Sequence, residues 1–443
     1  MKKEELPTYA VNLGINSGAS DVVASLVSWD GVMIRFSNNE VTVSKFFHEA
    51  VMKIFIMVEK HRAASTINVL SKEAVEDTVE NLIKIAKITP PADIYAPLPK
   101  GPFIYDPSLL KPSNVLQEPS KLTEYVKEGI DGALEAGAQR VAGSLVAANT
   151  QVILETSGNV HAEQKSSSLE ISIRAFTSKF SSGHGVSISQ DEKGFQPFEA
   201  GKHAGEIAKL AQNPKQIEPG KYKALLGPLI FANFVNQIGI QSSAFLIDAG
   251  QSFLTGKIGQ KVATELFTLR DDPTIPNTYG TKAFDDEGVP TRNNVIVERG
   301  TLKTYLHNTT TSKKFNTQTT SNAGLIVPQP WNLVVEQGNK RFEDLLSEID
   351  HGIYVTNGWY LRFQDYQRGD FSIVPRDGIF LIKDRSIAHP VKDLRISDNM
   401  LRIFQNIEGI SSERLWVKWW EVEVPTLTPY VIVNDLNFTR SLF

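Results

Sequence analysis

The chain has 443 residues, of which 41% are hydrophobic, and this length predicts two or three domains rather than one core. A net charge of −4 with 22% charged residues lacks the basic footprint of proteins that bind nucleic acid or anionic membranes. The absence of cysteine excludes disulfides, thiol catalysis and thiolate metal sites.

The N-terminal segment, MKKEELPTYAVNLG, contains no continuous apolar stretch, so we expect no signal peptide. No apolar run reaches the roughly 18 residues that a membrane span needs. The sequence therefore predicts a cytoplasmic protein.

Residues 20–60 have the alternation and apolar runs of β-strands. Turns are expected at Trp29-Asp30-Gly31 and at Asn38-Asn39. The predicted strands are Val22–Ser28, Val32–Ser37, Glu40–Phe46 and Ala50–Glu59. A helix over Ser71–Ile88 follows, with Ser71 as its N-cap.

A proline-rich connector separates this first unit from a second one. Eight prolines between Pro90 and Pro119 prevent a helix or a central strand there. The second unit is predicted to begin with a helix over Leu122–Ala136 and to end with one near Ala200–Leu210. Its predicted strands are Arg140–Ala147, Gln151–Thr156, Val160–Glu163 and Leu169–Phe176. A small, glycine-containing segment, Ser181–Ser189, follows them and starts in a turn-like context at 181–182.

The two units resemble each other when residue n is placed against residue n+119. Eight of 24 ungapped positions are then identical, and Val22–Ser28 aligns with Val141–Ala147. We infer an internal duplication and an α+β fold, in which two helix–strands–helix units precede a mostly β C-terminal domain. The predicted division is 1–90 for the first unit, 91–119 for the connector, 120–219 for the second unit and 220–443 for the C-terminal domain.

The C-terminal half contains many short apolar runs. A strand over Tyr222–Leu226 is followed by Phe231, Phe234, Val235 and Ile238 at helical spacing. Arg299-Gly300 is typical of a two-residue hairpin turn. In the block Gly369–Met400, strands are expected at Phe371–Val374, Ile379–Ile382 and Val391–Leu394, with turns at Arg376-Asp377-Gly378 and Lys383-Asp384-Arg385.

The blocks 256–306 and 369–400 resemble the TldD/PmbA family of peptidase subunits, and the resemblance extends over nearly the whole chain. In the catalytic TldD type, a helix after the first strand of this half carries H-E-x-x-x-H, and a C-terminal cysteine adds a ligand for zinc. With Gly256 and Gly259 as anchors, that hexapeptide falls on six residues that cannot bind a metal well or act as a base. These residues are Val235, Asn236, Gln237, Ile238, Gly239 and Ile240.

The resemblance therefore points to the PmbA/TldE branch, whose members lack the zinc motif and pair with a TldD-type subunit. We expect no catalytic residues, no bound metal and no cofactor in this chain. The eight histidines include no pair at helical i, i+3 or i+4 spacing. The acidic runs Asp271-Asp272 and Asp285-Asp286-Glu287 are followed by Pro273 and Gly288, which favours turn and scaffold roles.

Aromatic residues mark a second kind of candidate site. Most aromatic side chains on strands belong to a core, but tryptophan and tyrosine are also enriched at interface centres. The candidates for a subunit interface or a peptide lining are Trp416, Trp419, Trp420, Trp359 and Tyr360.

Three functional hypotheses follow from these residues. The first is a non-catalytic subunit of a TldD/PmbA-type metallopeptidase complex, which acts with a TldD-type partner on unfolded peptides. The second is an independent metallopeptidase with unusual ligands. The third is a homodimeric binding protein, in keeping with the family's older label, modulator of DNA gyrase.

Overall fold

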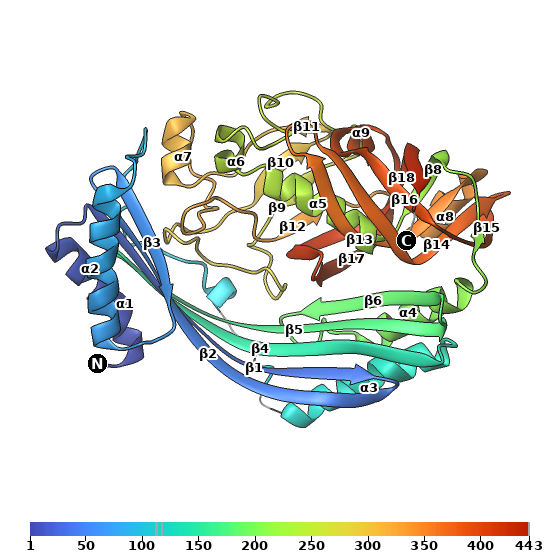
Figure 1. The fold of residues 1–443 in the computed structure, drawn as a ribbon, viewed down its shortest axis with the longest axis horizontal. Coiled ribbons are helices and arrows are strands. Elements are labelled where there is room, and N and C mark those ends of the chain that lie inside the picture. Colours follow the sequence, from blue (N-terminus) through green and yellow to red (C-terminus); the bar gives the residue numbers. More distant parts are fainter. Residues whose placement is uncertain (111–113, 117, 442–443) are drawn as a thin grey trace.

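A computed structural model describes residues 1–110, 114–116 and 118–441. Two bodies are stacked on each other: a long, curved N-terminal sheet and a strand-rich C-terminal body that lies over one face of it (Figure 1). The predicted α+β class with a strand-rich C-terminal half is confirmed. Within the described residues, no helix is long and apolar enough to cross a membrane.

The N-terminal sheet has the strand order β3-β2-β1-β4-β5-β6. Its strands are β1 (Asp21–Ser37), β2 (Glu40–Val58), β3 (His61–Ile67), β4 (Arg140–Thr156), β5 (Val160–Ser178) and β6 (Ser181–Ser189). The helices of this half are α1 (Leu6–Asn16), α2 (Lys72–Ile88), α3 (Pro119–Glu135) and α4 (Pro197–Leu210), and short 3₁₀ turns lie at Lys3–Glu5 and Pro107–Leu110. The Oγ of Ser71 accepts a hydrogen bond from the Ala74 N–H at 3.1 Å, which confirms the predicted N-cap.

Several predicted breaks in these strands were wrong. Residues 29–31 continue β1, because they pair with β2 on one side and with β4 on the other. Phe46 and Ala50 belong to one unbroken β2, and the two strand pairs predicted at 140–156 and 160–176 are likewise β4 and β5. The small, glycine-containing Ser181–Ser189, for which no strand was predicted, is strand β6, paired with β5. Hydrogen bonds from neighbouring strands outweigh the local turn preference of Asp, Ser and Gly in each case.

The order of elements repeats across the two units. Each has a helix, three strands and a second helix, and β1 and β4 pair antiparallel at the centre of the sheet. In that pairing Asp30 lies opposite Asn149, which follows it by 119 positions. Residues equivalent in the proposed duplication therefore meet at one point, as a pseudo-twofold axis through the pair requires. The domain boundaries at 90, 119 and 219 remain a prediction.

The core of the C-terminal body is a closed ring of five strands: β8 (Gly220–Leu226), β13 (His351–Asp365), β14 (Asp370–Lys383), β16 (Leu394–Asn399) and β18 (Val422–Arg440), which pairs back with β8. The other strands are β7 (Lys215–Gln216), β9 (Leu269–Asp271), β10 (Asn294–Glu298), β11 (Thr301–Leu302), β12 (Leu333–Val335), β15 (Ser386–Lys392) and β17 (Ile407–Trp419). The helices are α5 (Pro228–Gln241), α6 (Ala244–Asp248), α7 (Thr309–Lys314), α8 (Phe342–Ser347) and α9 (Met400–Gln405).

Turn predictions in this half had mixed outcomes. Arg299 and Gly300 have φ of 44° and 77° between β10 and β11, as a type I′ hairpin requires. The turn at 383–385 is also confirmed, since it joins β14 to β15. The turn predicted at 376–378 was wrong: β14 runs through it, and the pairing with β13 shifts there in a bulge where Asp377 has a φ of 57°.

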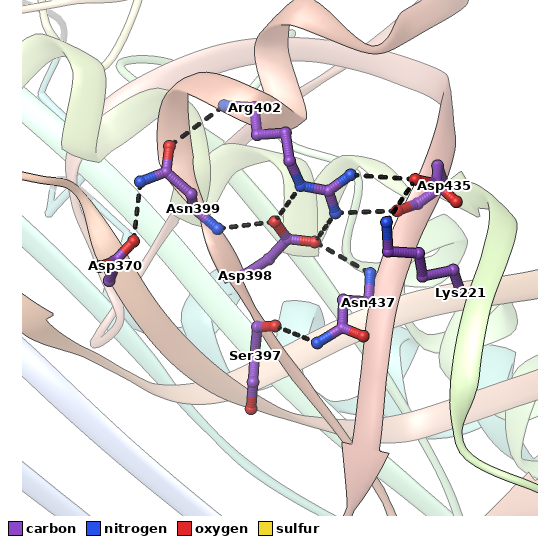
Figure 2. Close-up of polar contacts among 8 residues, drawn as sticks. All are labelled: Lys221, Asp370, Ser397, Asp398, Asn399, Arg402, Asp435 and Asn437. Carbon is purple, nitrogen blue, oxygen red and sulfur yellow. Dashed lines mark hydrogen bonds and ion pairs between the residues drawn. The ribbon is translucent and has the colours of Figure 1, made fainter.

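A buried carboxylate fastens the ring where β16 meets β18 (Figure 2). Asp398 accepts hydrogen bonds from Nε and Nη2 of Arg402, and from the backbone N–H groups of Asn399 and Asn437. Its side chain is 2% exposed, so the Arg402 guanidinium balances a charge that water does not reach. Asp398 and Arg402 therefore join β16 to β18 together, because Asp398 accepts from the Asn437 N–H and Nη2 of Arg402 donates to the carbonyl of Asp435.

We expect Arg402→Met to lower the free energy of unfolding by about 2 kcal/mol, because Asp398 would keep only its backbone donors. The measurement is urea unfolding followed by circular dichroism. Arg368→Met is the matched control, because Arg368 pairs with Asp365 on the surface, where an ion pair contributes little. Equal losses in the two variants would contradict the role given to Asp398.

Candidate functional site

The helix α5 carries the residues on which the family hexapeptide falls. It begins after β8 with Pro228 at its first position, and it is apolar on nearly every side. Val235 and Ile238 belong to the main core, whereas Gln237 and Ile240 are only partly buried. A helix that is apolar all round is typical of a core element, which explains its place beside β13 and β18.

Asn236 is one of three buried polar residues of α5, with Asn233 and Gln241, and it is the one that lies in the hexapeptide window. Its Nδ2 donates to the carbonyl of Val424 at 3.0 Å and to Oγ1 of Thr426 at 2.6 Å, and its Oδ1 accepts from the Val424 N–H at 3.0 Å. These bonds join α5 to β18. Across the residues that the structure describes, no group of three or more His, Cys, Asp or Glu side chains could hold a metal ion.

The acidic runs have structural roles. Asp271 is fully buried and accepts from the N–H groups of Trp331 and Asn332, both at 2.8 Å. Asp285 accepts from the N–H groups of Val289 and Ala323. Burial raises the pKa of Asp271 to about 6 and raises that of Asp285 well above its usual value. Both carboxyl groups organise loops of the C-terminal body, in line with the scaffold interpretation.

Four of the five predicted aromatic residues converge on one place. Ring centroids of Trp359 lie 5.6 Å from Trp419 and 5.3 Å from Trp420, and those of Tyr360 and Trp420 are 5.5 Å apart. Trp419 is buried, whereas about half of Trp420 is exposed. Trp416 has no ring contact with this group in the described structure and lies elsewhere on β17.

This aromatic group faces the N-terminal sheet across a contact centred on Asp377. The carboxylate of Asp377 accepts from Nε and Nη2 of Arg174 on β5 and from the Oγ of Ser182 on β6. Its other oxygen accepts from Nε1 of Trp359 at 3.0 Å. The Arg174 guanidinium also lies 4.8 Å from the Trp359 ring. The buried carboxylate of Asp377 is thus one of the links between the two bodies, beside others such as the ion pair of Lys418 with Glu170.

His184 on β6 is buried beside this contact, and its geometry superficially resembles a catalytic triad. Its Nε2 is 2.8 Å from the Oγ of Ser172, and its Nδ1 is 2.9 Å from Nδ2 of Asn357. The Gly358 N–H donates to Oδ1 of Asn357, which turns the amide Nδ2 toward the imidazole. Nδ1 therefore accepts, Nε2 carries the proton, and the ring cannot take a proton from Ser172.

Burial also lowers the pKa of His184 to about 4, so the ring stays neutral near pH 7. Sequence reasoning missed Arg174, His184 and Ser172, because they stand on ordinary strands with no motif around them. Asp377 was interpreted as part of a turn. The only signal for Asp377 is the bulge in β14. A bulge is defined by how two strands pair, so it cannot be predicted from the local sequence.

A pocket of about 240 Å³ lies between the aromatic group and the sheet. Its sheet side is formed by Ser144, Ser172, Arg174 and His184, and its other side by Trp359, Trp419 and Trp420. Ala142, Gly143 and Phe176 complete the sheet side, so that wall combines polar groups with an aromatic ring, and the opposite wall is aromatic.

Comparison with known proteins identifies the fold that carries these features. A family model described as the PmbA/TldA metallopeptidase C-terminal domain matches residues 219–440, half of the chain. The chain belongs to the PmbA/TldD family. The metalloprotease PmbA homolog of Haemophilus influenzae is 24% identical and aligns over 92% of this chain and 90% of its own length.

Other members share parts of the chain or its fold. A metalloprotease of Methanothermobacter thermautotrophicus is 32% identical, but the match covers only 48% of each protein, so this chain spans about half the length of that relative. The crystal structure of TldE from Thermococcus kodakarensis superposes with a TM-score of 0.83 over 98% of this chain and all of that one, at 21% identity. At this identity the superposition shows the shared fold.

Asn236 occupies the place where the resemblance to TldD puts the general base, and it provides a test of its structural role. We expect Asn236→Asp to lower the free energy of unfolding at pH 7 by about 2 kcal/mol, because a carboxylate would face the Val424 carbonyl without a donor. Burial would raise the pKa of that new carboxyl. The loss should therefore be small below about pH 4 and grow as the pH rises through the raised pKa.

The measurement is urea unfolding at pH 4 and pH 7. Gln237→Glu is the matched control, because Gln237 is the next residue, partly exposed and without a hydrogen bond of its side chain in the described structure. Its effect should stay within about 0.5 kcal/mol at both pH values. If Asn236→Asp lowers the free energy of unfolding equally at pH 4 and pH 7, the structural role given to the buried hydrogen bonds of Asn236 is contradicted.

Proposed function

We propose that this chain is a non-catalytic PmbA/TldE-like subunit of a TldD/PmbA-type metallopeptidase complex that acts on unfolded peptides. The observation that carries the proposal is made on α5. In its hexapeptide window, Val235 and Ile238 are packed in the core and Asn236 is hydrogen-bonded to β18, where a catalytic subunit would need metal ligands and a base. Hydrolysis by a metal needs about three N, O or S ligands and an open position. The partner subunit would supply the metal and the base.

The pocket between the aromatic group and the N-terminal sheet supports a role in holding peptide. An extended peptide can bind along strands through its main-chain hydrogen bonds, with little selectivity for side chains. The aromatic group of Trp359, Tyr360, Trp419 and Trp420 would form an apolar wall beside such a peptide.

One edge of the N-terminal sheet supports association with a partner. Residues 40–51 of β2 pair with β1 only, because β3 begins its pairing at Met52, and Val41, Val43 and Phe46 stay exposed. The equivalent half of β5 is covered: Val160 and Ala162 pack against the connector and the loop around Phe284. An uncovered, partly apolar strand edge is a place where another chain adds its own strand or surface.

The proposed activity is tested by peptide cleavage read out by mass spectrometry, with this chain alone, a TldD-type subunit alone, and both together. Alone, this chain should leave an unfolded peptide intact and contain no stoichiometric zinc. With the partner, it should raise cleavage. The variant Val235→His, Asn236→Glu, Ile240→His should remain inactive alone, because the family's cysteine ligand is missing.

Chelator-sensitive cleavage by this chain alone that survives further purification would overturn the proposal and favour an independent metallopeptidase. A failure of either subunit to stimulate the other would instead favour a homodimeric binding protein.

The β2 edge makes a separate prediction about association. We expect Phe46→Arg to weaken binding to the TldD-type subunit at least tenfold, because an unpaired charge would have to leave water at the contact. Phe180→Arg is the matched control: Phe180 is 75% exposed against 68% for Phe46, but it lies in the turn between β5 and β6. Isothermal titration calorimetry measures the affinity of each variant for the TldD-type subunit. Wild-type affinity in Phe46→Arg would remove this edge from the interface.

A further inference from the structure

We propose that the pocket between the sheet and the aromatic group binds a carboxylate, namely the C-terminal carboxylate of a peptide whose last side chain is apolar or aromatic. This inference rests on the proposed function, since it names the part of a peptide that this subunit would hold. It is carried by the hydrogen-bond donors that the polar side chains on the sheet side of the pocket leave available, above all the hydroxyl of Ser172 and Nη1 of Arg174.

Strand register places the polar wall on one face of the sheet. Ser144 of β4 lies opposite Ser172 of β5, and Arg174 lies opposite His184 of β6. Residues opposite each other in a sheet share a face, and alternate residues along a strand do so too. The four side chains therefore point together toward the C-terminal body, and all four line the pocket.

The hydroxyl of Ser172 is a donor toward the pocket. Its oxygen accepts the Nε2 proton of His184, because Asn357 holds Nδ1 of the ring as an acceptor. No other hydrogen bond of this hydroxyl is found within the described chain, and Ser172 is partly exposed. The proton of Ser172 is therefore available to an acceptor that enters the pocket.

Arg174 adds positive charge to the same wall. Its Nε and Nη2 donate to Asp377, while Nη1 has no hydrogen-bond partner in the described structure. The carboxylate of Asp377 is already occupied by Arg174, Ser182 and Trp359, and no acidic side chain is among the described residues that line the pocket. A bound anion would thus meet Nη1 of a guanidinium whose Nε and Nη2 are held by Asp377, and no acidic side chain of the described pocket lining would repel it.

The size and opposite wall of the pocket select what accompanies the carboxylate. Trp359, Trp419 and Trp420 contribute aromatic surface, and Arg174 stacks over the Trp359 ring. A volume of about 240 Å³ is below the roughly 300–1,000 Å³ of sites for drug-sized ligands. One residue with its carboxylate is the size that fits, which favours a chain end over an internal segment.

The test measures binding of three probes to the purified chain by calorimetry, with tryptophan fluorescence as a second readout. The probes are acetyl-Ala-Ala-Phe with a free carboxylate, the same peptide as its C-terminal amide, and acetyl-Ala-Glu-Ala amide. We expect the free acid to bind at least tenfold more tightly than the Phe amide, since hydrogen bonds to a charged group would be lost. The Glu peptide separates a side-chain carboxylate from a chain end, and it should bind no better than the Phe amide.

Two variants locate the binding. Ser172→Ala removes the donor, and Arg174→Lys keeps a positive charge beside Asp377 but loses the planar fork. Each should weaken binding of the free acid about tenfold and leave the weak binding of the amide unchanged. Ser166→Ala is the matched control, because Ser166 stands on the same strand, outside the pocket, and its loss should change neither.

Equal affinity for acid and amide, or no binding of either, would overturn the inference. If both variants still prefer the free acid, the binding site lies elsewhere. If the Glu peptide binds as tightly as the free acid, the pocket does not select a C-terminal carboxylate. These results are separable from the proposed function. A chain that stimulates a TldD-type partner but does not distinguish acid from amide refutes only the pocket.

Discussion

The arrangement of this protein depends on a buried carboxylate at the contact between its two bodies. A charge taken out of water costs several kcal/mol unless donors surround it. Asp377 meets that requirement only where β5, β6 and β13 come together, because its donors come from Arg174, Ser182 and Trp359. The bulge in β14 presents Asp377 at this place. The contact of Asp377 therefore helps to set the N-terminal sheet against the ring of strands, and the aromatic pocket lies beside this contact.

The same logic applies to α5, on which the family hexapeptide is predicted to fall. A metal-binding helix must leave polar side chains within reach of water and substrate. Here Val235 and Ile238 pack into the core, and the side-chain amide of Asn236 is hydrogen-bonded to the backbone of β18. Packing side chains at these positions stabilise the C-terminal body, since each large buried apolar residue contributes about 1.5–3 kcal/mol. We propose that the chain acts through the exposed edge of β2 and the pocket beside the aromatic group.

The N-terminal half contains two similar units in different surroundings. Around the pair of Asp30 and Asn149 the sheet is nearly symmetric in its order of strands. The first half of β5 is covered by the connector and by a C-terminal loop, whereas the matching half of β2 is bare. The sheet face of the second unit also forms the floor of the pocket. The asymmetry arises because only one C-terminal body packs on two units.

The sequence by itself determined features whose cause is local or compositional. Ser71 caps its helix with its own hydroxyl, and Arg299-Gly300 turns because both residues adopt positive φ. The repeat at an offset of 119 residues, the absence of cysteine and the absence of the zinc hexapeptide at 235–240 can also be read from the sequence alone. The family and the fold class could therefore be predicted. Tertiary structure decided the rest. Residues 29–31 are a strand because partners from 47–49 and 148–150 supply their hydrogen bonds, and Arg174, His184 and the tryptophans form one pocket because strands about 200 residues apart pack together. A local pattern reports the preferences of a segment, and it carries no information about which distant segment will satisfy its hydrogen bonds or bury its charge.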